Sequence, residues 1–386
     1  MRPAPRTYGH FICLTGLAVT LLAGTGCTSS GLNRARSRYY SGSFEEAAGT
    51  FDERPVRSRD QILMLMERGA AWQAAGEHQR AINDWLEAAD RMRELDYIRL
   101  SEQASSLIIS DATKTYAGWP YERALLHAHT AKSFFALQQW HAAAVEARLI
   151  AYGLEDLNAF PDDPYTRYVA ATAFELIRDY NGARIEFTKA DELTPHIRIN
   201  PVTGAITPGT NAPANVVPPD QEFIAFIGIG RAPTFNMGPP GQNLRWGSNP
   251  YVEVRQGDQI LGRSYTLMTT TTLAHETERR IAAIQAARTV TRIIIKESIS
   301  RAVEENNTLL GGILRIFLYA TEAPDTRSWQ TLPNWLQVAR VPLADDTTEL
   351  ELHFKTSAGT TIKTMRIHPE KMPRTDGKFI LQARAW

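Results

Sequence analysis

Asp325, Arg327 and Ser328 are the residues of this 386-residue chain whose types and spacing most suggest catalysis. A serine hydroxyl acts as a nucleophile only beside a base that a third group orients. Beyond the proline-rich segment 195–220, histidines occur only at His275, His353 and His368, and none stands in a known catalytic motif. We therefore expect no enzyme, and we keep an enzyme with its site near Asp325 and Arg327 as the alternative.

The same segment has a structural interpretation. Asp325 and Arg327 lie between Pro324 and Trp329, where an expected apolar helix gives way to expected strands. The backbone loses its regular hydrogen-bond partners at such a junction. A carboxylate can accept backbone N–H groups there, and a guanidinium can donate to carbonyls or to a facing acid. Trp329 can bury a large apolar area. We therefore predict that Asp325, Arg327 and Trp329 form a structural motif without a substrate.

Metal binding is not expected. His275 and Glu276 begin a zinc-protease pattern, but Arg279 stands where the second histidine is needed. The two cysteines, Cys13 and Cys27, both lie in the first 27 residues, so the body of the chain has no cysteine metal site and no disulfide framework.

Cofactors and nucleic acids are not expected either. Gly228 and Gly230 suggest a dinucleotide loop, but residues 231–233 (Arg-Ala-Pro) follow, and no third glycine opens a helix. Lys plus Arg and Asp plus Glu both number 42, which gives no sign of the basic face of a general nucleic-acid binder.

The N-terminus has the pattern of an export signal. Arg2 and Arg6 precede an apolar run of 13 residues, 11–23, which is too short to span a membrane. Small residues follow at 24–26, and then comes Cys27. This arrangement resembles the lipobox of bacterial lipoproteins, although a glycine replaces the usual leucine three positions before the cysteine. An ordinary signal peptide with an incidental cysteine is the alternative.

The resemblance implies a signal peptide over 1–26 and lipid, including palmitate or a similar acyl chain, on Cys27. Two or more acyl chains give stable anchoring where one does not. We expect residues 27–36 to hold the lipidated cysteine and a tether, because Thr28 to Gly31 are small and polar. Thr28 is not the aspartate that commonly retains lipoproteins in the inner membrane, which favours the periplasmic face of the outer membrane.

Residues 37–195 contain a repeated pattern of small and aromatic residues. Four alanines anchor it, the first two 34 residues apart: Ala47, Ala81, Ala144 and Ala183. This resembles tetratricopeptide repeats, in which small residues let paired helices approach closely. Arg54 and Arg148 break the pattern, and Lys132 stands where a small residue is expected. A generic helical bundle is the alternative.

The repeat spacing predicts an insertion and a binding surface. Ala81 and Ala144 are 63 residues apart, so an extra helix or long loop is expected around Leu100–Tyr121. A short stack of helical hairpins forms a curved groove suited to a peptide or a partner helix. We therefore expect an envelope protein to bind in this groove.

The sequence of the second half predicts an α+β domain over 221–386, which follows a proline-rich linker over 196–220. A long helix is expected over His275–Asn306 and a buried apolar helix over Leu309–Ala320. A strand is expected over Glu222–Gly230. Alternating residues predict a small antiparallel β unit of hairpins over Leu336–Leu343, Thr348–Thr356, Thr361–His368 and Lys378–Ala383.

One longer resemblance unites these features. The segment 322–343 (EAPDTRSWQTLPNWLQVARVPL), residues 111–122 and the lipobox are similar to a family of uncharacterised bacterial lipoproteins with tetratricopeptide-like helices. That family implies localisation and architecture, but no reaction. We therefore expect a membrane-anchored adaptor or scaffold of the bacterial cell envelope, in cell-wall synthesis or outer-membrane assembly. An envelope enzyme with a site near Asp325 and Arg327 is the alternative.

Overall fold

The computed structural model describes residues 30–53, 57–101, 115–155, 161–209, 218–234, 241–279 and 325–386. Within these residues the protein is mixed α+β, as predicted, with its helices mainly in the first half and its sheets in the second. Cys27 lies outside the described residues, as do the predicted helix over Leu309–Ala320 and all but the start of the one over His275–Asn306. Helical backbone covers 270–279. No described helix is long and apolar enough to cross a membrane.

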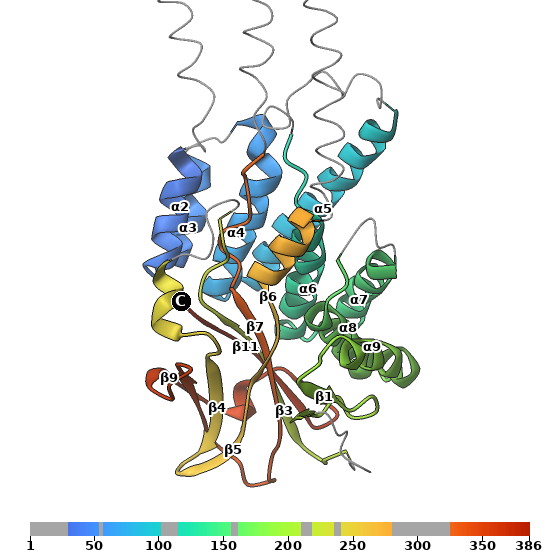
Figure 1. Cartoon of the computed structure of the whole chain (residues 1–386), viewed down its shortest axis with the longest axis vertical. Coiled ribbons are helices and arrows are strands. Elements are labelled where there is room, and N and C mark those ends of the chain that lie inside the picture. The colour runs from blue at the N-terminus through green and yellow to red at the C-terminus, as the bar shows by residue number, and fades with distance from the viewer. Residues whose placement is uncertain are drawn as a thin grey trace, which may run out of the picture.

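The first half consists of helical hairpins that follow one another in space (Figure 1). The paired helices are α2 (Ser30–Tyr40) with α3 (Phe44–Glu53), α4 (Gln61–Ala75) with α5 (His78–Ser101), α6 (Pro120–Ala136) with α7 (Trp140–Glu155), and α8 (Pro164–Leu176) with α9 (Tyr180–Glu192). Helix α2 begins at Ser30, so the predicted tether is wrong for residues 30–36. Leu32 and Ala35 of this segment are buried in the core, which explains why it is helical.

The alanine anchors fall at equivalent places. Ala47, Ala81, Ala144 and Ala183 each lie in the second helix of a hairpin, and none is more than 4% exposed. The expected insertion around Leu100–Tyr121 begins as an extension of α5, which has 24 residues. Residues 102–114 lie outside the described part. The backbone at 115–119 is not helical and leads into Pro120, the first residue of α6.

The strands form two larger sheets and one small hairpin. Their bounds are β1 (Ile197–Ile199), β2 (Ile206–Pro208), β3 (Glu222–Ile229), β4 (Tyr251–Gln256), β5 (Gln259–Arg263), β6 (Tyr265–Thr269), β7 (Trp335–Pro342), β8 (Leu350–Lys355), β9 (Thr361–Ile367), β10 (Arg374–Thr375) and β11 (Lys378–Ala385). Short 3₁₀ helices cover Ser58–Asp60, Gly241–Trp246 and Pro369–Lys371. One larger sheet has the order β10-β11-β3-β7-β6 and the other β5-β4-β8-β9.

The prediction of one small antiparallel unit is therefore wrong in its pairing. The predicted strands at the positions of β7, β8, β9 and β11 exist, but they divide between the two sheets. Strand β11 runs parallel to β3, and β7 runs antiparallel to β3 on its other side. Strands β4 to β6 were not predicted, although Val252 and Val254 alternate with polar residues and are buried.

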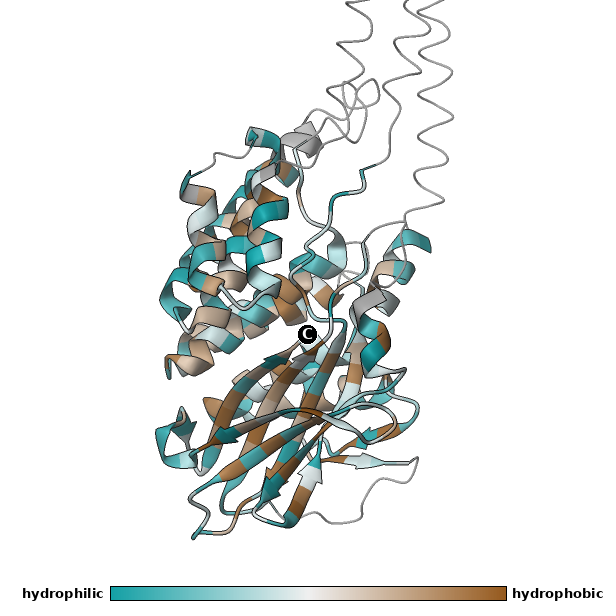
Figure 2. Cartoon of the chain, turned by 90° about the vertical axis from the view of Figure 1, so that its left-hand side faces the viewer, coloured by the Kyte–Doolittle hydropathy of each residue, from teal (hydrophilic) through white to brown (hydrophobic). Residues whose placement is uncertain are grey.

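The five-stranded sheet is the middle of three layers (Figure 2). All eight residues of β3 are buried. Ile224 and Phe226 pack in the core shared with the helices, while Phe223 and Ala225 pack in the core shared with the four-stranded sheet. A strand buried on both faces is apolar along its whole length, which explains the continuous apolar run in the sequence.

The predicted linker over 196–220 is structured over part of its length. Strands β1 and β2 pair as an antiparallel hairpin, and Ile199 and Ile206 are buried in the same core as the helices. The hydroxyl of Tyr168, on α8, donates to the carbonyl oxygen of Gly204 at 2.6 Å. The hairpin therefore belongs to the helical layer. Residues 210–217 lie outside the described part.

Candidate functional site: the inner face of the helical layer

Residues 325–334, which we call the strap, lie against the helical layer and lead into β7 without helix or strand structure of their own. Arg327 lies at its start and pairs with two carboxylates. Its Nη2 and Nε donate to the two oxygens of Asp325 at 2.7 and 2.9 Å, and its Nη1 donates to Oδ1 of Asp60 at 2.8 Å. Asp325 Oδ1 also accepts the backbone N–H of Arg327 at 3.0 Å. Arg327 thus ties the strap to the start of α4.

Trp329 is the buried centre of the strap. Its side chain is 1% exposed, and its ring lies 6.2 Å from that of Trp85 and 5.6 Å from that of His129, centroid to centroid. Its backbone N–H donates to Oε1 of Glu122 at 2.7 Å. The other oxygen of Glu122 accepts the backbone N–H of Trp119 at 3.0 Å, so one carboxylate caps α6 and holds the strap.

Other residues of the first helices also hold the strap. Arg36, on α2, pairs with Glu67, on α4, at 2.6 Å, and both are buried. Glu67 accepts the backbone N–H of Gln330 at 3.0 Å, and Arg36 donates to the carbonyl oxygen of Ser328 at 2.9 Å. Trp119 Nε1 donates to the carbonyl oxygen of Arg327 at 2.8 Å. Side chains of the helical layer therefore form hydrogen bonds with backbone N–H and carbonyl groups of the strap.

The groove that we expected to be open to a partner is occupied by the chain itself. The strap and one face of the five-stranded sheet cover the first helix of each hairpin. The physical reason is the apolar character of these helices: all 13 residues of α8 are buried. Such a surface is unstable in water unless another layer covers it.

The candidate catalytic residues do not form a nucleophile–base–orienter set. The Ser328 hydroxyl is buried without a hydrogen-bond partner in the described structure. His275 contacts Glu278, His353 contacts Glu351, and His368 contacts the carbonyl oxygen of Thr348. Among the described residues there is also no group of three or more His, Cys, Asp or Glu side chains placed to hold a metal ion.

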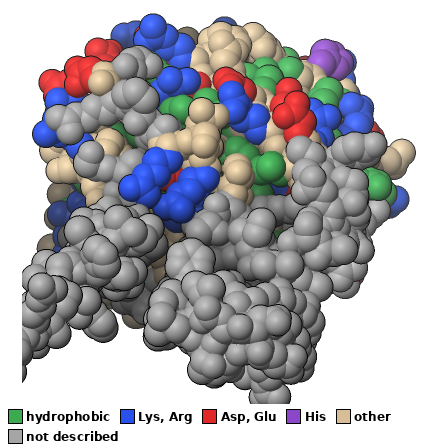
Figure 3. Space-filling model, turned by 90° about the horizontal axis from the view of Figure 1, so that it is seen from above, with side chains coloured by type: hydrophobic (Ala, Val, Ile, Leu, Met, Phe, Trp, Pro, Cys, Tyr) green, Lys and Arg blue, Asp and Glu red, His purple; other side chains and the backbone are tan. Residues whose placement is uncertain are grey.

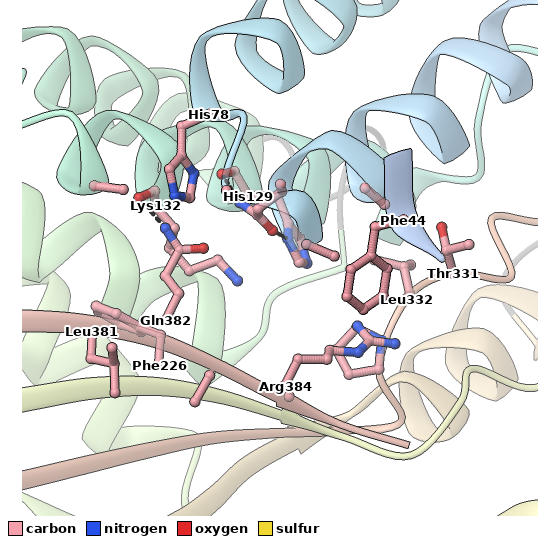
Figure 4. Close-up of a pocket in the computed structure, with 18 of the residues that line it drawn as sticks. Phe44, His78, His129, Lys132, Phe226, Thr331, Leu332, Leu381, Gln382 and Arg384 are labelled. Carbon is pink, nitrogen blue, oxygen red and sulfur yellow. Dashed lines mark hydrogen bonds between the residues drawn. The ribbon is translucent and has the colours of Figure 1, made fainter. Parts of the chain in front are cut away.

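Beside the strap lies a cavity of about 490 Å³, between the helices and β11. This volume is in the range of small-molecule sites. Figure 4 shows His129 and Lys132 extending from the helical layer, Gln382 and Arg384 from the strand opposite, and Phe44 beside Arg384. Aromatic side chains form much of the wall: Tyr39, Phe44, Tyr165, Phe226, Trp329 and Trp386.

The polar side chains of the cavity are basic or neutral. No described Asp or Glu lines it. Lys132 is 5% exposed, and its Nζ donates to the Tyr165 hydroxyl at 3.0 Å. Burial, with a smaller contribution from the nearby charge of Arg384, lowers the pKa of Lys132 to about 7. The Arg384 Nε is buried and has no hydrogen-bond partner within the described chain.

His129 lines the cavity from α6, the helix that also carries Lys132. The Gln73 amide donates to the His129 carbonyl oxygen at 3.1 Å and to Ser133 Oγ at 2.8 Å, so its oxygen faces His129 Nδ1 at 2.9 Å. Nδ1 therefore carries a proton. Nε2 is buried without a partner among the described residues. Burial, then the charges of Lys132 and Arg384, lower the pKa of His129.

Sequence reasoning did not find this cavity, but it noticed one of its residues. Lys132 stands where the repeat pattern calls for a small residue, on a helix that is otherwise largely buried. A lysine that breaks a packing pattern is a signal for a special environment. Arg384 and Gln382 carry no such signal, because alternating polar residues are ordinary in a strand.

A scan against protein-family models found no matching family, and a search among curated proteins found no relative. The resemblance to lipoproteins with tetratricopeptide-like helices therefore stays a prediction from the sequence.

Proposed function

We propose that the protein is a lipoprotein adaptor of the bacterial cell envelope that binds a protein partner and catalyses no reaction. A lipid on Cys27 anchors it, on the periplasmic face of the outer membrane. Its hairpins are tetratricopeptide-like repeats, and its place is in cell-wall synthesis or outer-membrane assembly. Four successive hairpins with a buried alanine at the same helix of each support the repeat assignment.

The observation that carries the proposal is the set of apolar side chains exposed on the second helices of the hairpins. On α7, Val145, Leu149 and Tyr152 are 51%, 44% and 78% exposed. Their spacing places them on one helix face. Tyr180 and Ile185 on α9 are exposed as well. Contiguous exposed apolar residues commonly mark protein-interaction surfaces. Because the inner face is covered by the strap, we place the partner on this outer face.

The charge distribution fits a protein partner better than a polyanion. On the face seen from above, basic and acidic side chains lie interspersed with apolar ones (Figure 3). A protein that binds nucleic acid or an anionic membrane would instead present a patch of positively charged side chains. The exposed apolar residues of α7 and α9 fit a protein with a complementary apolar patch.

Site-specific photo-cross-linking in intact cells tests the outer face. A photoreactive residue at position 149 or 152 should give one discrete adduct, and Val145→Glu should abolish it. The matched control position is Ile362, an exposed apolar residue of β9 in the outer sheet. Adducts that form equally at 362, or that survive Val145→Glu in a folded protein, would contradict the proposed surface.

The anchor needs a separate test. Cells labelled with a clickable fatty acid should label the wild type and not Cys27→Ala, which should leave the membrane fraction with an unchanged circular dichroism spectrum. A Cys27→Ala protein that is still labelled and membrane-bound would exclude lipidation at this residue, whatever the cross-linking shows.

A further inference from the structure

We propose that the cavity between α6 and β11 binds an amphiphilic anion, a small molecule with an acidic headgroup on an apolar chain. The headgroup lies between Lys132 and His129 on the helical side and Arg384 on the strand side, and the chain lies along the aromatic side chains of the cavity wall (Figure 4). This ligand site is independent of the adaptor surface on α7.

The first argument is unbalanced charge. The positive charge of Arg384 is close enough to Lys132 to disfavour a charge on the lysine, and no described acidic side chain lines the cavity to compensate. Burying cations without a counterion costs free energy. Elsewhere in the described part of the chain, the buried side chains of Arg36 and Arg340 do have carboxylate partners, Glu67 and Glu222. A bound anion would supply the partner that the chain itself provides at those sites.

The second argument is unused hydrogen-bonding capacity. His129 is 94% buried, yet its Nε2 has no partner in the described structure although it belongs to a residue that lines the cavity. The Arg384 Nε atom is also buried and has no hydrogen-bond partner in the described structure. Buried polar atoms are nearly always paired in folded proteins. Because Nδ1 of the neutral His129 ring carries the proton, Nε2 can accept an O–H of the headgroup or take up a proton on binding, whereas Arg384 Nε can only donate. Two such atoms on opposite walls of one cavity point to a ligand with polar atoms between them.

The third argument is the apolar end. Tyr39, Phe44 and Trp386 form one cluster, with ring centroids 5.5 Å apart for Tyr39 and Trp386 and 5.3 Å apart for Phe44 and Trp386. All three line the cavity. An inorganic anion would leave this wall in contact with water, whereas an apolar chain would cover it. The Arg384 guanidinium lies over the Tyr39 ring, 5.8 Å from its centroid, so the cationic groups adjoin this aromatic wall. The combination of buried cationic groups and an adjoining aromatic wall therefore selects an amphiphile.

Titration calorimetry of the purified full chain tests the proposal with four probes: octanoate, octyl phosphate, octan-1-ol and inorganic phosphate. At least one of the two anionic amphiphiles should bind one-to-one and about tenfold or more tighter than octan-1-ol, because a charge-assisted hydrogen bond is worth that much. The stronger of the two identifies the headgroup. Inorganic phosphate should bind more weakly than octyl phosphate.

Variants locate the binding. Lys132→Met and Arg384→Met should each weaken the anionic amphiphile about tenfold and leave octan-1-ol unchanged. Lys371→Met, at an exposed lysine outside the cavity, is the matched control and should bind like wild type. Measured at pH 8 in two buffers of different ionisation enthalpy, wild type should take up protons on binding the anion, and Lys132→Met should take up fewer.

Three results would overturn the inference: neither anionic amphiphile binds, octan-1-ol binds as tightly as both, or inorganic phosphate matches octyl phosphate. Unchanged affinity in a folded Lys132→Met would also overturn it. Proton uptake by the wild type keeps the test decisive if Arg384→Met does not fold. None of these results depends on partner cross-linking at α7.

Discussion

The carboxylate of Glu122 and the backbone N–H of Trp329 are joined by a 2.7 Å hydrogen bond across 207 positions of sequence. The same carboxylate accepts from the backbone of Trp119 and from the hydroxyls of Tyr116 and Tyr121. Burial outweighs these hydrogen bonds and raises the pKa of Glu122 to about 7. One side chain thus holds the N-terminus of α6 and the middle of the strap together.

Glu122→Ala should therefore lower the free energy of unfolding by about 3 kcal/mol, because it leaves several buried donors without an acceptor. Urea denaturation followed by circular dichroism measures this. Glu94→Ala, at an exposed position of α5, is the control and should change stability by less than about 0.5 kcal/mol. Equal midpoints for the two variants would show that Glu122 does not hold the strap.

Arg327→Lys tests the ion pairs at the start of the strap. Lysine keeps the charge but cannot form the paired bonds to Asp325 and the bond to Asp60 together, so stability should fall by about 1–2 kcal/mol. Arg178→Lys is the matched control: Arg178 also forms a two-point pair with an aspartate, Asp376, but is exposed, so its loss should be near zero.

The catalytic alternative makes the opposite prediction for this segment. It expects Arg327→Lys and Asp325→Asn to melt like wild type while losing all function in cells. If the segment is structural, function should be lost only as far as folding is lost. Thermal melts beside the cross-linking yield at position 152 separate the two interpretations.

Much of the local secondary structure could be predicted from the sequence. The apolar run of β3 and the alternating residues of β8 predicted strands that exist, because burial of side chains leaves its period in the sequence. Strand β9 was also predicted from alternation, although only Ile367 of its residues is buried. The alanine anchors were predicted at close helix contacts, and each is buried in the second helix of a hairpin. The tether over 27–36 was predicted from small polar residues alone, and the buried Leu32 and Ala35 outweighed them.

The sequence did not indicate which segments that are distant along the chain would contact one another. We predicted that Arg327 would donate to carbonyls or to a facing acid, but Asp60 lies 267 positions away and has no feature that marks it as the partner. The groove was predicted as open because repeat spacing describes the helices and says nothing of what covers them. The basic cavity forms because Lys132 and Arg384 line it from opposite sides, and their separation in sequence hides this arrangement.

The alanine anchors should tolerate no larger side chain. Ala81→Leu and Ala183→Leu put three extra carbons each at positions 0% and 4% exposed, and overpacking should cost about 1–3 kcal/mol. Ala344→Leu, at an exposed position after β7, is the control with the same added volume. Unchanged melting temperatures for both anchors would mean that these alanines do not mark close helix contacts.

The helical layer should not be stable by itself. Residues 30–209 without the rest would expose the surfaces that Trp329, Phe226 and Ile380 now cover, since these belong to the same core as the helices. The fragment should bind a hydrophobic dye such as anilinonaphthalene sulfonate and melt less cooperatively than the full chain. A fragment that melts as sharply as the full chain and binds no dye would indicate two independent domains.

The pH dependence of stability should show the buried Lys132. Its pKa falls from 10.5 in the unfolded chain to about 7 in the folded protein, so between these values the unfolded state binds more protons. Stability therefore rises with pH across this window, and below pH 7 the full cost of burying the charge is present. The groups around it are His129 on its own helix, His78 at the start of α5, Tyr165 on α8, Lys363 on β9 and Arg384 on β11.

None of those neighbours is an acid, so Lys132→Met should remove the dependence instead of shifting it. The difference in unfolding free energy between wild type and Lys132→Met is the quantity to measure, at intervals from pH 7 to pH 10, because the other titrating groups largely cancel in it. Wild type should become steadily more stable relative to Lys132→Met as pH rises. Lys371→Met, whose side chain is exposed, should run parallel to wild type. A pH-independent difference for Lys132→Met would mean that Lys132 keeps an ordinary pKa and that the cavity is not a desolvated cationic site.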